Sequence, residues 1–435
     1  MFNFLKNKEA KNAGWIIGGK IIQMIISFFV GVLSARYLGP GNYGLINYAS
    51  AYVAFFTSFC TLGINSVIVK DFIDNPNEQG VAIGSTLLMR VISSTLSAIM
   101  IVAIVGIIDN DEPLTIIVTA LCALALPFHV FDTINYWFQS RYQSKVTSIA
   151  TLIAYIVTSA YKIILLILGK SVEWFAVATS VDYICLAIIL FIVYKKNDGP
   201  KIKFSWQKGK QLLKSSYHYI LSGMMVAIYG QTDKLMLKQM LDETAVGYYA
   251  TATALCGMWT FVLSAIIDSI NPTILQLNGK NEEAFNKKCK QLYAIVFYVS
   301  AFVSLCFLLL GDVAIKILYG DAFMPAVMPL KIVTWYTAFS FLGVARDSWV
   351  VCKNKQKYLK YLYLTAAILN VLLNLLLIPM WGPSGAALAS LMTQVSTSII
   401  LPLFIKDLRP NAKLMLEAII LKDVFTKNKK VNEGE

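Results

Sequence analysis

Long apolar segments recur along almost the whole 435-residue chain and constrain its fold more than any other feature. A helix that crosses a bilayer needs roughly 20 mostly apolar residues. Twelve such runs lie near residues 14–34, 43–64, 81–107, 114–138, 147–168, 174–194, 217–237, 246–270, 291–311, 325–346, 361–380 and 384–405. Because a backbone in hydrocarbon must satisfy its own hydrogen bonds, each run is predicted to be an α-helix. The chain is therefore predicted to be an all-α membrane protein with about twelve transmembrane helices.

Composition agrees with this fold class. Hydrophobic residues make up 57% of the chain, charged residues only 14%, and the mean hydropathy is +0.63. These values are typical of membrane proteins. The basic stretch and apolar run at the start are interpreted as the first span and not as a cleaved signal, because eleven more runs follow. The seven cysteines form no disulfide framework and no zinc-binding spacing.

The distribution of basic residues predicts the orientation of the chain. With the amino terminus inside, 29 of the 38 Lys and Arg residues fall on the inner side, 4 on the outer side and 5 within spans. Inner loops of membrane proteins carry this excess of positive charge, so both termini are predicted to be cytoplasmic. The net charge of +13 then reflects topology, and no nucleic-acid partner is expected.

Two sequence blocks repeat within the chain. Four residues of the first block match four of the later one at an offset of 203: Leu38, Gly44, Ala49 and Ala51 match Leu241, Gly247, Ala252 and Ala254. A further block repeats at an offset of 213, from Gln143 and Gly169 to Gln356 and Gly382. The pattern favours two six-helix halves around a central cleft, related by an axis along the membrane normal. The alternative is chance, since Gly and Ala are common in membrane helices.

The repeat predicts four regions. The first half covers residues 1–196, a cytoplasmic linker 197–216, the second half 217–405, and a cytoplasmic tail 406–435. The tail alternates apolar and charged residues from Asn411 to Phe425. This pattern is typical of an amphipathic helix lying in the membrane surface with its apolar face toward lipid.

Charged residues within spans are costly and are functional candidates. Lys20, Arg90 and Lys162 are the candidates for a substrate lumen, and Asp132, Asp182, Asp233 and Asp268 are the candidates for binding a coupling ion. Polar stripes support some of them: Lys20, Gln23 and Ser27 in helix 1; Thr151, Tyr155, Thr158 and Lys162 in helix 5; His218, Ser222, Tyr229 and Asp233 in helix 7. Three such stripes facing one cleft would form a hydrated lumen for a bulky hydrophilic head group. The alternative is hydrogen bonding between helices and snorkelling near helix ends, which is favoured for Lys234 and Lys331.

Histidine is too rare for a metal site. His129 and His218 are widely separated in the sequence, and both are interpreted as packing residues. No catalytic constellation and no cofactor motif is found.

Several short segments resemble one transporter family. SARYLGPGNYGL follows helix 1, and Asp233 precedes VGYYATATA. LYGDAF lies at Leu318–Phe323, and WGPSGAALA at Trp381–Ala389. Together they resemble the Wzx-type polysaccharide flippases of the multidrug/oligosaccharidyl-lipid/polysaccharide exporter superfamily.

This resemblance implies a substrate and a mechanism. A polyprenyl-diphosphate-linked oligosaccharide would pass from the inner to the outer leaflet of the bacterial cytoplasmic membrane by alternating access, for the synthesis of a surface polysaccharide such as capsule or O-antigen. The lumen would be cationic, a proton or sodium gradient would drive transport, and no covalent chemistry or cofactor would be needed. Expected partners are the lipid-linked oligosaccharide, membrane lipids, and a polysaccharide polymerase with its chain-length machinery.

Other functions stay open at this point. A drug exporter of the same superfamily would share the fold, and an exporter of teichoic-acid or peptidoglycan precursors would be closer still. A membrane polymerase or acyltransferase is disfavoured, because it would need a large outer loop and the outer loops here are all short.

Overall fold

The structure is a computed structural model that describes residues 8–422 and 424. Within these residues every regular element is a helix. The chain divides into two compact units, Met1–Gly247 and Tyr248–Glu435. The all-α membrane fold predicted from the sequence is confirmed.

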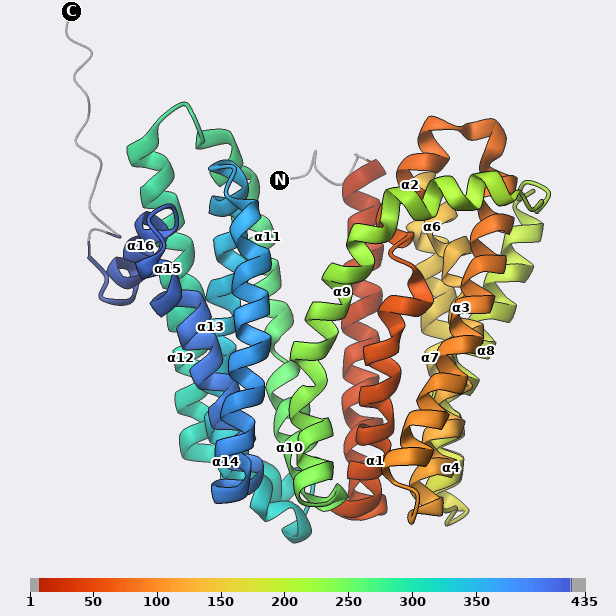
Figure 1. Ribbon diagram of the computed structural model, residues 1–435, viewed down its shortest axis with the longest axis horizontal. Coiled ribbons are helices and arrows are strands. Elements are labelled where there is room, and N and C mark those ends of the chain that lie inside the picture. Colours follow the sequence, from red (N-terminus) through yellow and green to blue (C-terminus); the bar gives the residue numbers. More distant parts are fainter. Residues whose placement is uncertain (1–7, 423, 425–435) are drawn as a thin grey trace, which may run out of the picture. The chain divides into compact units, whose positions relative to one another are not determined.

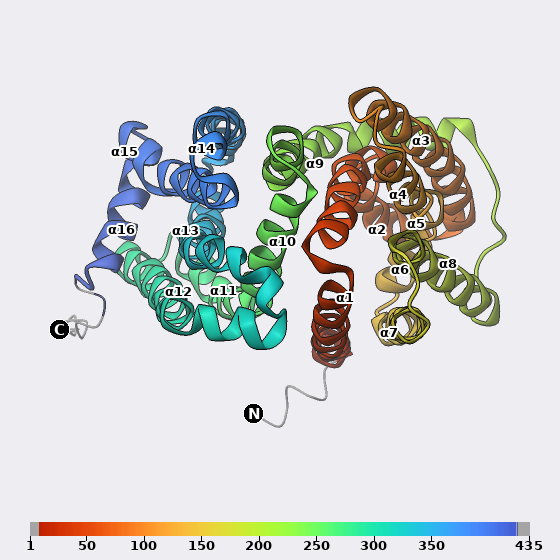
Figure 2. The ribbon, with the colours of Figure 1, turned by 90° about the horizontal axis from the view of Figure 1, so that it is seen from below.

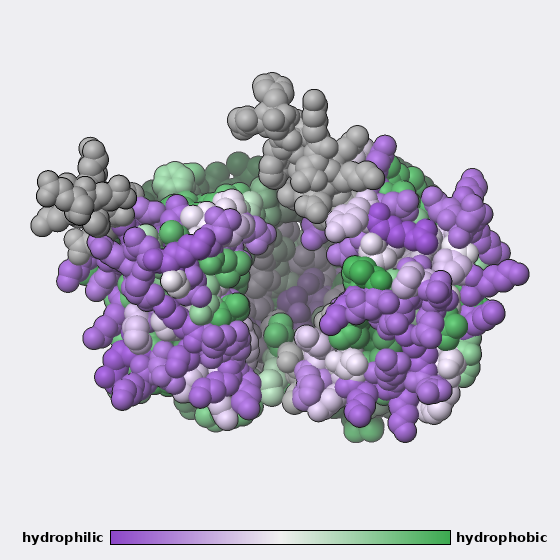
Figure 3. Space-filling model, turned by 90° about the horizontal axis from the view of Figure 1, so that it is seen from above, coloured by the Kyte–Doolittle hydropathy of each residue, from purple (hydrophilic) through white to green (hydrophobic). Residues whose placement is uncertain are grey.

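The first unit is a bundle of long helices (Figures 1 and 2). Its elements are α1 (Lys8–Thr61), α2 (Asn65–Asp74), η2 (Pro76–Glu78), α3 (Gln79–Ile108), α4 (Pro113–Ala123), α5 (Leu126–His129), α6 (Asp132–Ser140), α7 (Ser144–Ile167), α8 (Val172–Lys196), α9 (Trp206–Met240) and the start of α10 (Glu243–Gly257). The face of the first unit at the α2 end carries mostly hydrophilic side chains (Figure 3). Such a surface is expected outside a bilayer.

Nine helical stretches among the described residues are long and apolar enough to cross a membrane. Two of them each contain two of the predicted runs. In α1 the helix breaks at Gly39, whose φ of 73° lies in the left-handed region, and Pro40 follows it. The last stretch, Gln356–Phe404, breaks at Gly382 with a φ of 53°. The predicted run 217–237 is helical within α9 but is too polar to be among the nine, so the count of twelve stays a prediction.

The fourth predicted span is not one continuous helix. The apolar run 114–138 is divided into α4, α5 and α6, with turns at Leu124 and Val130. Pro127 lies within α5 and has no backbone N–H, so the helical hydrogen-bond ladder is interrupted there. The break exposes backbone carbonyls inside the span, and these need other donors.

The matched glycines of the two repeats lie against each other. A Cβ added to Gly44 would lie 1.7 Å from the carbonyl oxygen of Glu243, and one added to Gly247 would lie 2.1 Å from the carbonyl oxygen of Pro40. No side chain fits at either position, and small residues allow this close helix approach in membranes. The close contact explains why both repeats carry glycine at this place.

Ion pairs connect both ends of α9 to other parts of the first unit. At one end Lys208, which is 5% exposed, donates to Asp71 and Glu78 at 2.9 Å each. At the other end Lys238 contacts both oxygens of Glu112 at 2.7 Å and lies 3.2 Å from Glu243.

A network of hydrogen bonds extends this second contact. The Gln239 amide donates to the Asp109 carboxylate at 2.9 Å and to the Tyr48 hydroxyl at 2.7 Å, and the Tyr48 hydroxyl donates to Asp109 at 2.8 Å. Charge-assisted hydrogen bonds of this kind are stronger than neutral ones. α9 is therefore a structural part of the first unit.

The pair Lys238–Glu112 predicts a defined pH window. Hydrogen bonds from Lys238 and Thr115 hold the pKa of Glu112 below its usual 4.5. Burial acts to lower the pKa of Lys238, but Glu112 and Glu243 outweigh it and raise that pKa above 10.5. The contribution of the pair to stability should thus be complete between pH 4.5 and 10.5, and it should be lost as pH falls through the lowered pKa of Glu112 or rises through the raised pKa of Lys238.

We expect Lys238→Met to lower the unfolding temperature of the detergent-solubilised protein by a constant amount across this window. The difference from the unsubstituted protein should shrink at acid pH, where Glu112 is protonated. Lys170→Met, at an exposed lysine that only approaches the Trp174 ring, is the matched control and should change little. A Lys238→Met effect that did not depend on pH would contradict the assignment.

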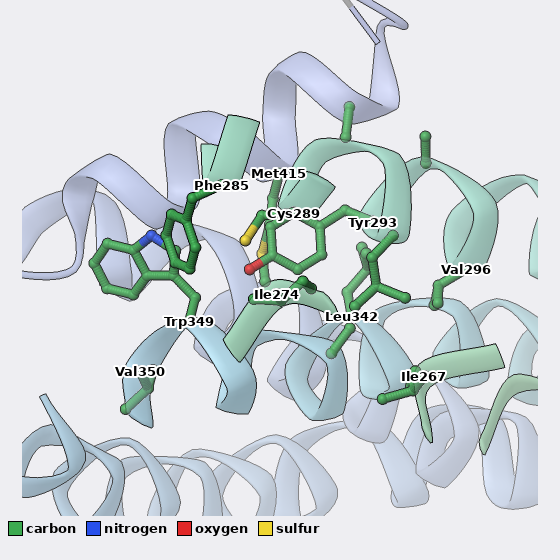
Figure 4. Close-up of a cluster of buried hydrophobic side chains, with 14 of the residues drawn as sticks. Ile267, Ile274, Phe285, Cys289, Tyr293, Val296, Leu342, Trp349, Val350 and Met415 are labelled. Carbon is green, nitrogen blue, oxygen red and sulfur yellow. The ribbon is translucent and has the colours of Figure 1, made fainter. Parts of the chain in front are cut away.

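The second unit is built around α12 and α13. It contains most of α10, then α11 (Thr260–Leu277), α12 (Glu282–Leu318), η3 (Asp321–Ala326), α13 (Val327–Cys352), η4 (Gln356–Tyr358), α14 (Leu359–Val395), the π-helix η5 (Ser396–Ile400), α15 (Leu401–Phe404) and α16 (Arg409–Ile419). Its core gathers Phe285, Tyr293, Leu342, Trp349 and Met415 from three of these helices (Figure 4).

The tail helix packs on protein, which corrects the prediction that its apolar face meets lipid. Met415 and Ala418 of α16 are fully buried in the core of the second unit. The Asn411 amide donates to the Tyr293 hydroxyl at 2.6 Å, and Lys290 pairs with Glu417 at 3.1 Å. A hydrophobic periodicity reports that one face is covered but not what covers it. Phe425, the last residue of the predicted helix, lies outside the described residues.

Candidate functional site

A polar cavity of 420 Å³ lies inside the first unit. It is lined by Gly19, Lys20, Gln23, His129, Asp132, Asn135, Gln139, Ser144, Thr147, Ser148, Thr151, Leu152, Asp182, Tyr183 and Leu186. These residues come from α1, α5, α6, α7 and α8. Most of them are hydrogen-bonding or charged, whereas pockets for small ligands are usually lined by apolar groups with few polar ones. The cavity therefore suits a strongly hydrophilic ligand.

Two of the predicted polar stripes meet at this cavity. Lys20 and Gln23 of α1 line it together with Thr147 and Thr151 of α7. A Cβ on Gly19 would lie 3.4 Å from Cβ of Ser148, so the two helices approach closely beside the cavity. The Lys20 side chain is exposed, which leaves its ammonium accessible to a ligand.

His129 and Asp132, which also line the cavity, form a hydrogen-bonded pair. Nε2 of His129 lies 3.1 Å from Oδ2 of Asp132, and the two side chains are only 15% and 21% exposed. Nδ1 of His129 lies 3.2 Å from Nη2 of Arg90. Because a guanidinium only donates, Nδ1 must accept, and the imidazole proton sits on Nε2 and points to Asp132. The sequence interpretation of His129 as a packing residue missed its acidic neighbour three residues on.

Arg90 contacts His129 but is not among the residues that line the cavity. Its side chain is 2% exposed. Its guanidinium donates to the carbonyl oxygens of Cys60 and His129 at 3.3 Å each, and to the Thr133 hydroxyl at 3.0 Å. These acceptors lie near the end of α1 and at the break between α5 and α6, where helical partners are missing. Arg90 thus reaches the cavity through His129.

Lys162 and Asp182 form a second charged group in the same unit. The Thr158 hydroxyl donates to Oδ1 of Asp182 at 3.2 Å, and Asp182 interacts electrostatically with Lys162. Asp182 lines the cavity, whereas Lys162 is half-buried and is not among its lining residues.

The remaining candidates lie elsewhere. Asp233 of α9 is 6% exposed and engaged in polar contacts, and Asp268 is exposed on α11 of the second unit. In the polar stripe predicted for residues 217–237, now in α9, the His218 ring lies 3.7 Å from that of Tyr217, and the side chain of Ser222 is outside the described part. Lys331 pairs with Asp312 at 2.7 Å.

Six polar cavity residues have no counterpart among the sequence candidates: Asn135, Gln139, Ser144, Thr147, Ser148 and Tyr183. Asn135 and Gln139 lie one turn apart on α6, a helix too short to show a stripe. In the described part of the chain, no group of three His, Cys, Asp or Glu residues is arranged to hold a metal ion.

The sequence is similar to known proteins of one family. The sequence model of the polysaccharide biosynthesis protein family matches residues 32–328. The capsular polysaccharide biosynthesis protein CapF of Staphylococcus aureus is 20% identical over 88% of this chain and 96% of its own length.

Two solved structures share the fold at lower identity. The lipid II flippase MurJ, in an inward closed conformation, has a TM-score of 0.68 and 16% identity, with 95% of this chain and 93% of that chain covered. A multidrug resistance MATE family transporter, in an inward-facing conformation, has a TM-score of 0.66 and 12% identity, with 91% and 96% covered.

The family match spans more than half of the sequence. It agrees with the family resemblance drawn from the SARYLGPGNYGL block and its companions. This multi-pass membrane protein belongs to the polysaccharide biosynthesis protein family, the Wzx-type flippases of the multidrug/oligosaccharidyl-lipid/polysaccharide exporter superfamily.

Proposed function

We propose that this protein moves a polyprenyl-diphosphate-linked oligosaccharide from the inner to the outer leaflet of a bacterial cytoplasmic membrane. The observation that carries the proposal is the hydrophilic cavity of the first unit with the exposed ammonium of Lys20 on its wall. A membrane interior holds such a cavity only at a cost, so a transported hydrophilic group gives it a purpose.

The chemistry of the cavity fits a sugar diphosphate. Lys20 supplies a positive charge for the diphosphate, and this attraction is stronger in a low-dielectric region than in water. Asn135, Gln139, Thr147 and Thr151 supply donors and acceptors for sugar hydroxyl groups. Transport needs no covalent step, and we propose no enzymatic activity and no cofactor.

Of the three cations predicted for the lumen, we assign direct contact with the diphosphate to Lys20 alone. Arg90 and Lys162 act on the cavity through His129 and Asp182, their respective neighbours. For the coupling ion we propose Asp132 and Asp182, because both carboxylates lie on the cavity wall. Asp233 and Asp268 gain no support from their positions in α9 and α11.

The orientation follows from the charge distribution, and we propose that both termini are cytoplasmic. Membrane lipids surround the protein, and a polysaccharide polymerase with its chain-length machinery would receive the translocated unit.

A gene deletion tests the proposal. Loss of the gene should abolish a surface polysaccharide and leave its lipid-linked repeat unit accumulating at the inner leaflet, measured by protection from an externally added glycosidase. Complementation with the unsubstituted gene should restore both. Accumulation of a teichoic-acid or peptidoglycan precursor instead would reassign the substrate. Unchanged surface polymers together with new sensitivity to cationic drugs would overturn the proposal in favour of a drug exporter.

A further inference from the structure

The segment between α8 and the middle of α9 presents an unusual surface. Exposed apolar and basic side chains alternate along it, from Lys201 and Ile202 to Lys203 and Phe204, and then continue on α9. We call the six residues Lys201, Ile202, Lys203, Phe204, Trp206 and Lys210 the linker surface. Nothing in the transport site uses these residues.

The backbone of this segment is fixed on α3. The Lys203 amide donates to the carbonyl of Gly80 at 3.1 Å, and Ser85 and Ser205 exchange two hydrogen bonds of 2.9 Å. A Cβ on Gly80 would lie 2.2 Å from the carbonyl oxygen of Lys201. Together with the buried Lys208, these contacts hold the segment in one place, so the exposure of its side chains is built into the fold.

The exposed apolar side chains of the linker surface are large. Ile202 is 42% exposed, Phe204 51% and Trp206 68%. Exposed Trp and Phe beside Lys are typical of segments at the membrane–water boundary, where an aromatic ring and a charge are both accommodated. A solvent-facing loop would not be expected to hold three such side chains in place.

The position of the segment indicates what covers these side chains. A Cβ on Gly84 would lie 2.9 Å from Cγ2 of Ile202. One and two turns further along the same face of α3 are Leu88 and Ile92, 44% and 51% exposed, within a predicted span. Exposed apolar residues of a span face lipid. Ile202 therefore continues the lipid-facing stripe of α3 up to its end at the membrane boundary.

The positive charges of the linker surface indicate which lipid headgroups it binds. Lys201, Lys203 and Lys210 are exposed, and Lys214 extends them one turn further on α9. Two nearby acidic residues, Asp71 and Glu78, are both bound by Lys208, so they are not free to pair with the outer lysines. Basic residues at a membrane surface attract anionic headgroups.

We propose that the linker surface binds anionic phospholipid at the cytoplasmic leaflet, with Ile202, Phe204 and Trp206 in the acyl boundary and the lysines on the headgroups. The bound lipid anchors the start of α9, the helix that is fastened at both ends to the first unit. This inference concerns lipid contact and does not depend on which substrate is transported.

The fluorescence of Trp206 reports whether its side chain contacts lipid. The purified full-length protein and its Trp206→Phe variant are reconstituted in liposomes, and the difference in fluorescence isolates Trp206 from the seven other tryptophans. Brominated phosphatidylglycerol should quench this signal about twofold more than brominated phosphatidylcholine at the same mole fraction. The preference should disappear in the triple variant Lys201→Gln, Lys203→Gln, Lys210→Gln.

A matched control removes three lysines elsewhere. The triple variant Lys280→Gln, Lys357→Gln, Lys360→Gln has the same net charge and should keep the preference. Equal quenching by the two lipids would overturn the anionic selectivity. Quenching of Trp206 by aqueous iodide and not by either lipid would overturn the proposal as a whole and indicate a surface open to a protein partner. Because Trp206→Phe changes one exposed side chain, the comparison stands even if a lysine variant fails to fold.

Discussion

Replacing Lys20 by glutamine should reduce transport at least about tenfold while the amount of membrane-inserted protein stays normal. Lys20 is the exposed cation of the cavity, and its removal leaves the diphosphate without a fixed counter-charge in a region of low dielectric. A loss of only about 1.4 kcal/mol of attraction at the barrier is a tenfold loss of rate. The measurement is surface polysaccharide per molecule of inserted protein in a deletion strain.

Two further variants separate charge from other effects. Lys20→Arg should keep most of the transport because it retains the charge. Lys170→Gln removes an exposed lysine outside the cavity and should have no effect. Full transport by Lys20→Gln at normal expression would refute the role of Lys20, and loss of the protein itself in that variant would point to a structural role.

Replacing Arg90 by methionine should act on folding, with a cost of about 3 to 5 kcal/mol. Removing this side chain leaves two backbone carbonyls, the Thr133 hydroxyl and Nδ1 of His129 without their buried donor. The expected result is a marked fall in the folded fraction, measured by size-exclusion chromatography of a fluorescent fusion after heating.

The conservative substitution sharpens this second test. Arg90→Lys keeps the charge, but a single ammonium cannot reproduce the planar fork that reaches acceptors near both α1 and the α5–α6 break, so it should recover only part of the stability. Folded, heat-stable Arg90→Met protein that had lost only transport would contradict this structural role and assign Arg90 a function in the cavity.

The spans were predictable because hydropathy over 20 residues is a strong signal, and a chain in lipid has few alternatives to the helix. The backbone breaks inside α1 and α14 lie at Gly39 and Gly382, and a proline directly follows each glycine in the sequence. The break in the fourth span was missed, since an apolar run stays apolar through Pro127 whether or not the helix continues.

The cavity was predictable only in part. Lys20 and Gln23 recur at helical spacing within α1, so their common face followed from the pattern. His129 and Asp132 are three residues apart, a spacing at which side chains meet on a helix, so this pair could have been found from the sequence. Which helices face one another does not follow from a single sequence. For the same reason the sequence could not separate Asp182, which lines the cavity, from Asp268, which is exposed on another unit.

The place of α9 in the first unit has a consequence for biosynthesis. Membrane proteins insert and fold as they are synthesised, beginning from the amino terminus. When α8 has emerged, Asp71 and Glu78 at one end of the unit, and Asp109 and Glu112 at the other, still lack the partners that α9 brings. The first unit is therefore unfinished until the ribosome has passed Gln239, and during that interval its acidic groups are available to any chaperone that recognises incompletely assembled membrane proteins.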